Sequence, residues 1–307
     1  MESLLIPASL IAGGLLAVQA GANAQLSKAT GSPFAATTLQ LSVGTLALLV
    51  LVLFTGTLTT LAALPEVPWW HAIGGVASAF YVVSTILLFP RLGAVVSVGL
   101  FIAGQMLASF ALDVAGLAGG APRAIDAPLA IGMLAILAGA ALMVKGQSGQ
   151  ASQPIPGKAG WIVLALLGGA VLPVQGVVNG LLRNDLGAPF AVGAVSFLVA
   201  TLAMAGVLLF SALFLRTPAP TLRSLPAMPW WGWLGGFAGA IYVTTVFTAI
   251  PVIGASAAVG LTVAGQQVAS VFVDRHGWFR LPRREVSPLR LLGVALLLAG
   301  VAIIKLL

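Results

Sequence analysis

Amide side chains that occur twice at the same spacing are the residues best suited to bind a small molecule. Gln19 and Asn23 lie four residues apart in one apolar segment, and Gln175 and Asn179 repeat the pair in another. Residues four apart share one face of a helix. Because an amide in hydrocarbon needs a hydrogen-bond partner, we expect these side chains to point into a helix bundle. There they either bond across helices or line a polar binding cavity.

Glutamine and tyrosine side chains are further candidates, because each can form a hydrogen bond while packing against apolar groups. They serve either as walls of the same cavity or as interhelical bonds and interfacial anchors. The predicted substrate-binding set is Gln19, Asn23, Tyr81, Gln105, Gln175, Asn179, Tyr242 and Gln266. Paired tryptophans at 69–70 and 230–231 are more typical of an aromatic belt at the membrane surface.

Asp113 and Asp274 are the carboxylates that occur at corresponding positions in two similar stretches of the chain, each near the end of an apolar segment. Such an aspartate is either solvated at a helix end or takes part in gating or proton coupling. The apolar segments carry no other acid. This weakens any mechanism that couples transport to a carboxylate buried in mid-membrane.

The sequence lacks the groups that most catalysis and metal binding require. It has no cysteine, and its two histidines, His71 and His276, are far apart. The sequence has no glycine-rich phosphate loop with its lysine and no paired carboxylates at membrane depth. We therefore expect no enzyme activity, no metal and no cofactor.

Composition makes the lipid bilayer the expected solvent. Of the 307 residues, 60% are hydrophobic and 7% are charged, whereas soluble proteins have about 25% charged residues. A membrane-spanning helix needs about 20 apolar residues. Ten segments qualify: residues 4–22, 33–56, 69–89, 92–112, 127–145, 159–181, 189–214, 230–250, 253–273 and 289–306. The fold class predicted is all-α integral membrane, and Pro90 and Pro251, between adjacent segments, are expected to end the helices before them.

The chain contains the same five-helix unit twice. The sequence VQAGAN at 18–23 recurs as VQGVVN at 174–179, 156 residues later, and PWW at 68–70 recurs at 229–231, 161 residues later. A linker rich in Gly, Ser and Pro at 146–158 separates the repeats at 1–145 and 159–307. Because five is odd, the second repeat must cross the membrane in the opposite direction, which is an inverted repeat typical of transporters. Gly235 and Gly239 form a GxxxG pattern that predicts a close backbone crossing.

Basic residues indicate the orientation in the membrane. One face collects eleven of them: Lys28, Arg91, Lys145, Lys158, Arg216, Arg223, Arg275, Arg280, Arg283, Arg284 and Arg290. The other face has three: Arg123, Arg183 and Lys305. The positive-inside rule makes the first face cytoplasmic, which predicts a multi-pass protein of the bacterial inner membrane with both termini outside the cytoplasm. The basic residues form no stripe, so we expect no nucleic acid partner. The expected partners are the bilayer and a small-molecule substrate, and a homodimer is left open.

Several motifs together resemble a known family. They are VQAGANAQL at 18–26, GSP at 31–33, PWW at 68–70, AGQ at 103–105 and AG at 299–300. The chain resembles the YdcZ-like family of the drug/metabolite transporter superfamily, in the form that fuses two five-helix units. The superfamily includes the small multidrug exporters, which use a glutamate in their first helix. This chain has Gln19 and Gln175 in the first helices of its repeats.

The resemblance implies a transporter or exporter of a small metabolite or drug-like solute that works by alternating access between inverted repeats. A second hypothesis is a membrane scaffold or regulatory subunit that transports nothing. A third, an intramembrane enzyme, requires a catalytic group that the sequence does not display.

Overall fold

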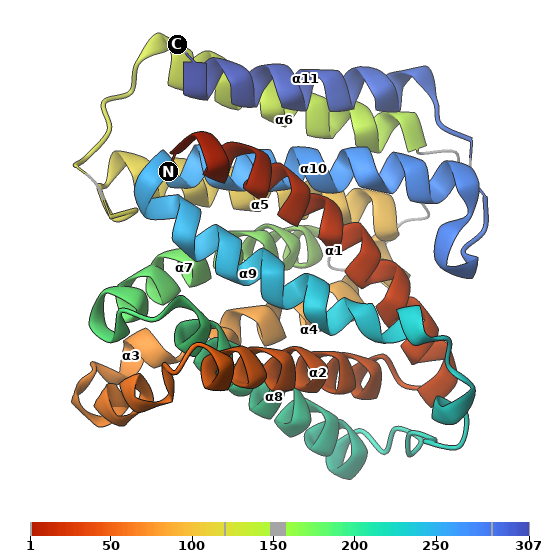
Figure 1. Cartoon of the computed structure of the whole chain (residues 1–307). Helices are drawn as coiled ribbons and strands as arrows, with labels where there is room; N and C mark the ends of the chain where they lie inside the picture. Colours follow the sequence, from red (N-terminus) through yellow and green to blue (C-terminus); the bar gives the residue numbers. More distant parts are fainter. Residues whose placement is uncertain (1, 120, 148–157, 284, 307) are drawn as a thin grey trace.

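The computed structural model describes residues 2–119, 121–147, 158–283 and 285–306, and its regular elements in these ranges are helices (Figure 1). The long helices are α1 (Glu2–Thr30), α2 (Pro33–Phe54), α4 (Gly75–Leu92), α5 (Ala94–Val114), α6 (Ala127–Gln147), α7 (Lys158–Leu186), α8 (Pro189–Phe214), α9 (Leu234–Ile253), α10 (Ala255–His276) and α11 (Pro288–Leu306). Within the described ranges, nine helices are long and apolar enough to span a membrane, and the tenth, α11, has a shorter apolar stretch. The linker predicted at 146–158 falls largely on residues 148–157, which lie outside the described residues.

Short helices join some of these spans. They are η1 (Leu58–Glu66), α3 (Trp69–Ala72), η2 (Leu225–Ala227), η3 (Trp230–Trp233) and η4 (Trp278–Arg280). The segments predicted as single helices at 69–89 and 230–250 therefore each begin with a short separate turn, α3 or η3. The prediction that α1 ends at residue 22 is wrong, since α1 continues to Thr30. Its polar last turns are stabilised by tertiary contacts, for instance the bond from Gln25 Nε2 to the Phe279 carbonyl oxygen at 2.7 Å.

Glycines, and not prolines, end the third helix of each repeat. Pro90 and Pro251 lie inside α4 and α9, which corrects the expectation that they terminate these helices. The helices continue to Gly93 and Gly254, whose φ angles are 79° and 86°. A residue with a Cβ adopts such an angle only with strain, so glycine is the natural stop.

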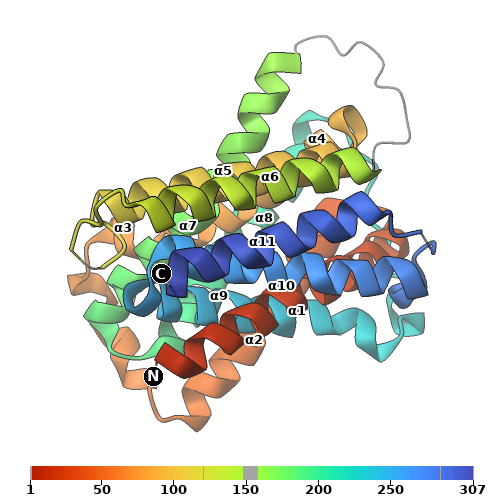
Figure 2. The same ribbon diagram turned by 90° about the horizontal axis from the view of Figure 1, so that it is seen from above.

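The helices form layers in which one repeat is packed on the other (Figures 1 and 2). The layer of α6 and α11 lies at the top of Figure 1, followed by α1 on α10 and α5 on α7, then α9 and α4, and finally α2 on α8. Exchanging the two repeats maps this set of contacts onto itself. The axis of this pseudo-twofold passes between the Thr45 and Thr201 hydroxyls, which are 3.0 Å apart and 156 residues apart in sequence.

Four glycines permit two equivalent close crossings between the repeats. A Cβ on Gly13 of α1 would overlap the backbone of Thr262 in α10, and one on Gly265 would overlap the backbone of Leu10. The equivalent crossing of α7 with α5 uses Gly169 and Gly104 in the same way. Gly104 and Gly265 are the glycines of the repeated AGQ motif. The motif therefore holds the two repeats together by close backbone packing.

The predicted GxxxG pattern has a different role from the one expected. Gly235 leaves room for the side-chain amide of Gln40, and a Cβ on Gly239 would lie 2.8 Å from Gln19 Nε2. The close backbone crossing in this region is made by the neighbouring Gly236, where a Cβ would lie 2.7 Å from the backbone nitrogen of Gly44. The glycines at 235 and 239 thus make space for amides of the first repeat.

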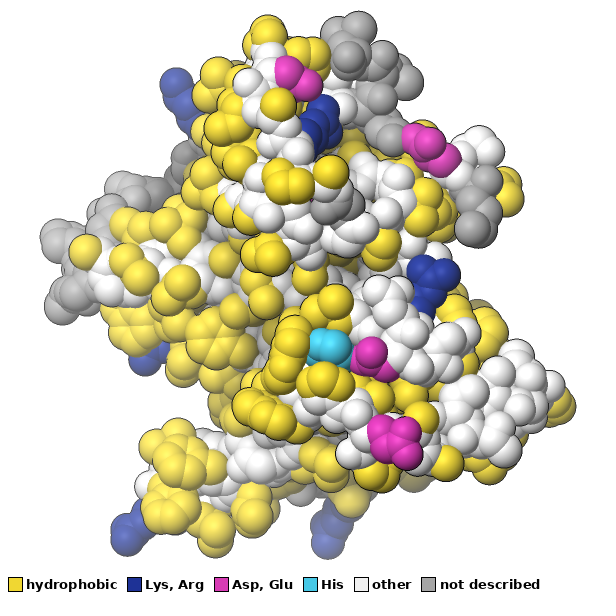
Figure 3. Space-filling view, turned by 90° about the vertical axis from the view of Figure 1, so that its left-hand side faces the viewer, with side chains coloured by type: hydrophobic (Ala, Val, Ile, Leu, Met, Phe, Trp, Pro, Cys, Tyr) yellow, Lys and Arg dark blue, Asp and Glu magenta, His cyan; other side chains and the backbone are white. Residues whose placement is uncertain are grey.

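The bundle has two ends, which differ in charge. The terminal end holds the two chain termini and α3; it is the left-hand side of Figure 1 and faces the viewer in Figure 3, with acidic side chains among apolar ones. Helices α5 and α7 end there, which places Asp113 and Asp185 in their last turns at this end, with Arg123 in the loop before α6. The Arg-rich end holds Lys28, Arg91, Arg216, Arg275, Arg280, Arg283 and Arg290. Successive spans run alternately between these ends. This confirms the predicted class, an all-α integral membrane protein with inverted five-helix repeats.

Candidate functional site

The amide pair of the second repeat lies in a network of buried side chains that joins three helices. Gln175 Nε2 donates to Ser78 Oγ of α4 at 2.8 Å, and Asn179 Nδ2 donates to Ser196 Oγ of α8 at 3.1 Å. The exposed fractions of Gln175 and Asn179 are 5% and 1%. The pair therefore bonds helices of both repeats and is almost fully buried in this conformation.

The amide pair of the first repeat is at the equivalent helix junction but is more accessible. The Gln40 side chain donates to the backbone oxygen of Gln19 at 3.2 Å, and Asn23 Nδ2 donates to Thr37 Oγ1 at 3.3 Å. Both Gln19 and Asn23 are partly exposed. The two pairs thus occupy separate junctions related by the pseudo-twofold, with Gln19 against α9 and Gln175 against α4.

Both asparagines keep an unused acceptor. The Oδ1 atoms of Asn23 and Asn179 are buried and have no hydrogen-bond partner among the described protein atoms. A buried acceptor without a partner is costly. Such an acceptor occurs at the same position in both repeats. This is expected if Oδ1 accepts a hydrogen bond from a ligand, or from another protein group in a second conformation.

The two tyrosines lie on the side of each repeat that faces the other. Tyr81 of α4 contacts the ring of Phe101 with 5.0 Å between ring centroids, while Tyr242 of α9 is buried, with 8% of its surface exposed. Tyr81 and Tyr242 are repeat equivalents and are therefore related by the pseudo-twofold axis.

The predicted glutamines follow the crossing glycines. Gln105 of α5 is 5% exposed, and Gln266 of α10 is partly exposed. The neighbouring Gln267 is 4% exposed and its Oε1 lies 3.4 Å from Ser270 Oγ. The positions next to the α5–α7 and α1–α10 crossings are thus polar in both repeats.

Asp113 is not a solvated residue at a helix end. Its side chain is 5% exposed, and its two carboxylate oxygens accept the backbone N–H groups of Ala255 and Ser256, at 2.6 and 2.7 Å. Asp274 has a different partner, Arg290, with 2.7 Å between Oδ2 and Nη1. The structure therefore does not bring the two aspartates together, and it gives them unlike environments.

An interface that occurs once within each repeat is closed at the terminal end and open at the Arg-rich end. Helix α7 packs on α9, where Gly176 lies against the side chains of Ile250 and Val246. The equivalent helices, α1 and α4, make no more than marginal contact with each other. The bundle is therefore asymmetric although its two halves share one design.

Equivalent residues of the two repeats also differ in their exposed fractions. Phe89 is 37% exposed, whereas its equivalent Ile250 is 1% exposed. Ala94, the first residue of α5, is exposed, whereas Ala255, the first residue of α10, is 0% exposed. The surfaces that are sealed at the terminal end thus remain accessible at the Arg-rich end.

The described residues form a surface pocket at each end of the bundle. A cavity of about 430 Å³ is lined by Arg275, Arg283, Glu285 and Val286. A second of about 330 Å³ lies beside Asp113, Arg123 and the junction of α9 with α10, and Asp113 is the one predicted site residue that lines either of them. Among the described residues, no group of three or more His, Asp or Glu is placed to hold a metal ion.

Sequence reasoning did not identify several residues that complete these networks. Gln40 and Ser196 are repeat equivalents, each on the second helix of its repeat and each bonded to the first. The sequence feature that could have identified them is a polar residue at the same position in the second helix of each repeat. The ion pair of His71 with Asp185, 2.5 Å between Nδ1 and Oδ2, had no such signal because it occurs in one repeat only.

Comparisons with known proteins agree with this architecture. The family model described as "Putative inner membrane exporter, YdcZ" matches the chain twice, over residues 4–142 and 160–303. A solved structure described as "Crystal structure of protein" has the same fold, with a TM-score of 0.69, 19% sequence identity, and coverage of 98% of this chain and 96% of that one. No curated protein matches in sequence. The two family matches correspond to the two five-helix repeats, and the chain belongs to the YdcZ family of inner-membrane transport proteins.

Proposed function

We propose that this protein exports a small metabolite or drug-like solute by alternating access between its inverted repeats. The observation that supports this most is the unequal state of one duplicated interface, α7 with α9 and α1 with α4. In an inverted repeat, exchange of the two conformations between the halves closes one end and opens the other. In the opposite state, α1 packs on α4 as α7 now packs on α9, so each state uses a contact of a type that the chain already makes.

The substrate site in this proposal is the partly exposed junction beside Gln19 and Asn23, with Tyr81 and Tyr242, which the pseudo-twofold axis relates, and Gln105 and Gln266 beside the crossings. Amides and phenols bind through hydrogen bonds and packing. The described spans place no carboxylate among these groups, which favours neutral or zwitterionic solutes over multivalent cations. Gln175 and Asn179 take over the same role when the terminal end opens.

The proposed orientation follows from charge. The Arg-rich end holds most of the basic residues, so the positive-inside rule places it in the cytoplasm and both termini outside. The conformation described above is then open to the cytoplasm and closed to the outside, the state in which an exporter takes up its substrate.

Thermal unfolding of the purified protein, in the presence of metabolites and lipophilic cations, tests the proposal. A ligand at 100 times its dissociation constant stabilises the folded state by about 2.7 kcal/mol. We expect Asn23→Ala to lose this stabilisation and Ser42→Ala to keep it. Ser42 is a matched control because its hydroxyl bonds only within its own helix, to the Thr38 carbonyl oxygen at 2.8 Å.

The rival hypothesis is a membrane scaffold or regulatory subunit that transports nothing. The observation in its favour is that Gln175 and Asn179 bond across helices as structural groups do. It predicts that no solute stabilises the protein and that proteoliposomes accumulate none. Solute uptake by proteoliposomes that depends on Asn23 would exclude it.

A further inference from the structure

Asp113 joins the two repeats at the terminal end. It lies in the last turn of α5, and its carboxylate accepts two N–H groups at the start of α10, from Ala255 and Ser256. The first N–H groups of a helix have no partner in the helix and carry its partial positive charge. Hydrogen bonds from such groups to a carboxylate are stronger than those between neutral groups. Asp113 thus closes this end with a charged bond from one repeat to the other.

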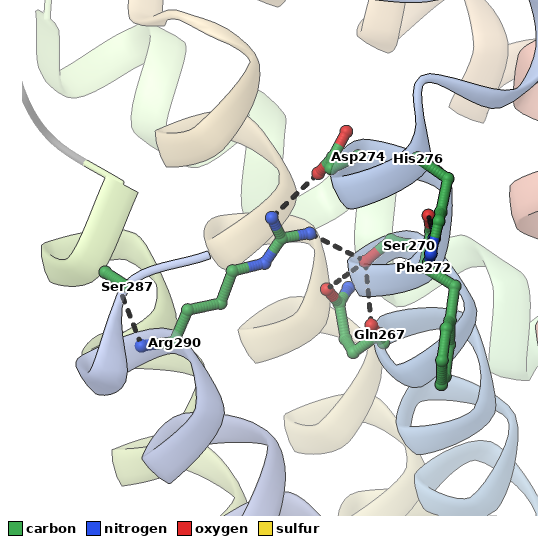
Figure 4. A network of polar contacts seen from close by, with 7 residues as sticks. All are labelled: Gln267, Ser270, Phe272, Asp274, His276, Ser287 and Arg290. Atoms are coloured by element: carbon green, nitrogen blue, oxygen red, sulfur yellow. Dashed lines mark hydrogen bonds and ion pairs between the residues drawn. The ribbon is translucent and has the colours of Figure 1, made fainter. Parts of the chain in front are cut away.

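Asp274 holds the same position in the second repeat but does not make this bond. The N–H groups equivalent to those of Ala255 and Ser256 belong to Ala94 and Val95, at the exposed start of α5. The Asp274 carboxylate instead pairs with Arg290 in the first turn of α11 (Figure 4). This difference in partner falls at the Arg-rich end, where α1 and α4 of the first repeat make no more than marginal contact.

Arg290 is specific to the second repeat. It is 3% exposed, and its Nη2 also donates to Ser270 Oγ at 3.0 Å (Figure 4). The equivalent position in the first repeat, 161 residues earlier, is Leu129. Arg290 therefore competes for the Asp274 carboxylate, whereas no basic residue occupies the equivalent position near Asp113. Asp113 has Arg123 beside it in the pocket of about 330 Å³.

We propose that Asp113 and Asp274 are alternating latches, and that Arg290 sets the resting state by withholding Asp274 from the start of α5. This inference rests on the alternating access proposed above. When the terminal end opens, Asp113 releases α10, and Asp274 leaves Arg290 to accept the N–H groups of Ala94 and Val95. Asp113 binds α10 with both of its carboxylate oxygens. When Asp274 binds α5 in the same way, its Oδ2, which now pairs with Arg290, must leave Arg290.

Cysteine labelling measures the two ends separately. The chain has no cysteine, so Phe89→Cys and Ile250→Cys each introduce a single reporter at equivalent positions of the two ends. In protein reconstituted into nanodiscs, a soluble maleimide reaches both faces. We expect fast labelling at position 89 and slow labelling at position 250 in the otherwise unchanged chain.

Three latch variants have different expected effects on these rates. Asp113→Asn removes the charged bond that closes the terminal end, and should raise labelling at 250 about tenfold and lower it at 89. Asp274→Asn removes the latch of the other state and should lower labelling at 250 further. Arg290→Gln breaks the same ion pair as Asp274→Asn but frees Asp274 to hold α5, so it should act like Asp113→Asn.

Asp126→Asn is the matched control. Asp126 also caps a helix with its carboxylate, but within its own repeat, accepting the Leu129 N–H of α6 at 2.9 Å. It should change neither labelling rate. The latch proposal is overturned if Asp113→Asn leaves both rates as they were, or if Asp274→Asn and Arg290→Gln shift them in the same direction.

A further variant separates failure of the latches from failure of alternating access. Gly176→Leu prevents α7 from packing on α9 without touching an aspartate, and position 89 reports its effect from the other end. If Gly176→Leu slows labelling at 89 while the latch variants do not, the latches are wrong and alternating access stands. If labelling at 89 responds to none of these variants, both proposals are contradicted.

Discussion

The terminal end and the Arg-rich end are built from equivalent residues, yet one is closed and the other open. At the terminal end, Gly176 lies against Ile250, whereas the equivalent Ala20 and Phe89 are exposed. The chain contains two copies of this interface, α7 with α9 and α1 with α4, which are the gates of the proposed mechanism, and the first copy is closed in this conformation. The comparison separates the molecule into a scaffold common to both repeats and two gates that differ.

The largest expected effect belongs to the common scaffold. Gly104→Ala places a methyl group onto the backbone of Leu166 at the α5–α7 crossing, so the helices must separate. We expect a loss of about 3 kcal/mol in unfolding free energy, measured by thermal unfolding in detergent. Gly206→Ala in α8 is the control, because its Cβ meets open space and alanine gains about 0.5–1 kcal/mol in a helix. Equal stability of the two variants would contradict the crossing as a shared anchor.

A smaller effect is expected where the gates differ. Gly176→Leu forces the side chains of Ile250 and Val246 to move, and should destabilise this conformation by about 2 kcal/mol. Its equivalent, Ala20→Leu, enters exposed space and should change the unfolding free energy by less than about 0.5 kcal/mol. A loss of similar size in both variants would mean that the Arg-rich end is closed in solution.

The ion pair of His71 with Asp185 should contribute less. The side chains are 11% and 29% exposed, so water weakens the pair, and His71→Ala should cost about 1 kcal/mol. The equivalent positions hold Gly232 and Ala29, which makes this a contact of the terminal end alone. A double-mutant cycle with Asp185→Asn isolates the pair, and a coupling energy near zero would remove it as a cause of the difference between the ends.

The smallest effect is expected on the pseudo-twofold axis. Thr45→Val and Thr201→Val each break the hydrogen bond of 3.0 Å between the two hydroxyls, at a cost of about 0.5 kcal/mol. Because the residues are equivalent, the two variants should lose the same amount, and the double variant little more. Unequal losses, measured by thermal unfolding, would show that the environments differ even at the axis.

Much of the fold was predictable from local sequence. The boundaries of α8 were predicted to the residue, since Pro189 opens the helix and the apolar run ends at Phe214. The positions of the other spans followed from runs of apolar residues, because a bilayer of fixed thickness admits helices of similar length. The inverted repeat followed from the sequence offset and an odd number of spans. The errors lay at helix ends such as Thr30, where a tertiary contact stabilises polar turns.

The candidate site was predictable only as a set of residue types. The sequence indicated that Gln19 and Asn23 share a helix face, and this depends on local periodicity alone. It did not determine that Gln40 and Thr37 bond the first pair, or that Ser78 and Ser196 bond the second. Those partners lie on other helices, so the packing of one helix on another decides them.

The sequence by itself determined the solvent of this protein, its duplicated architecture and the polar positions within its spans, because hydrophobicity and periodicity are local properties of the chain. Only the tertiary structure decided which gate is closed, that Asp113 holds α10 and that Asp274 pairs with Arg290. Those features depend on contacts between different helices, such as that of Asp113 with Ala255, 142 positions apart, and on the choice between two arrangements of one duplicated interface. Equivalent residues allow both arrangements, and the energies of long-range contacts select one.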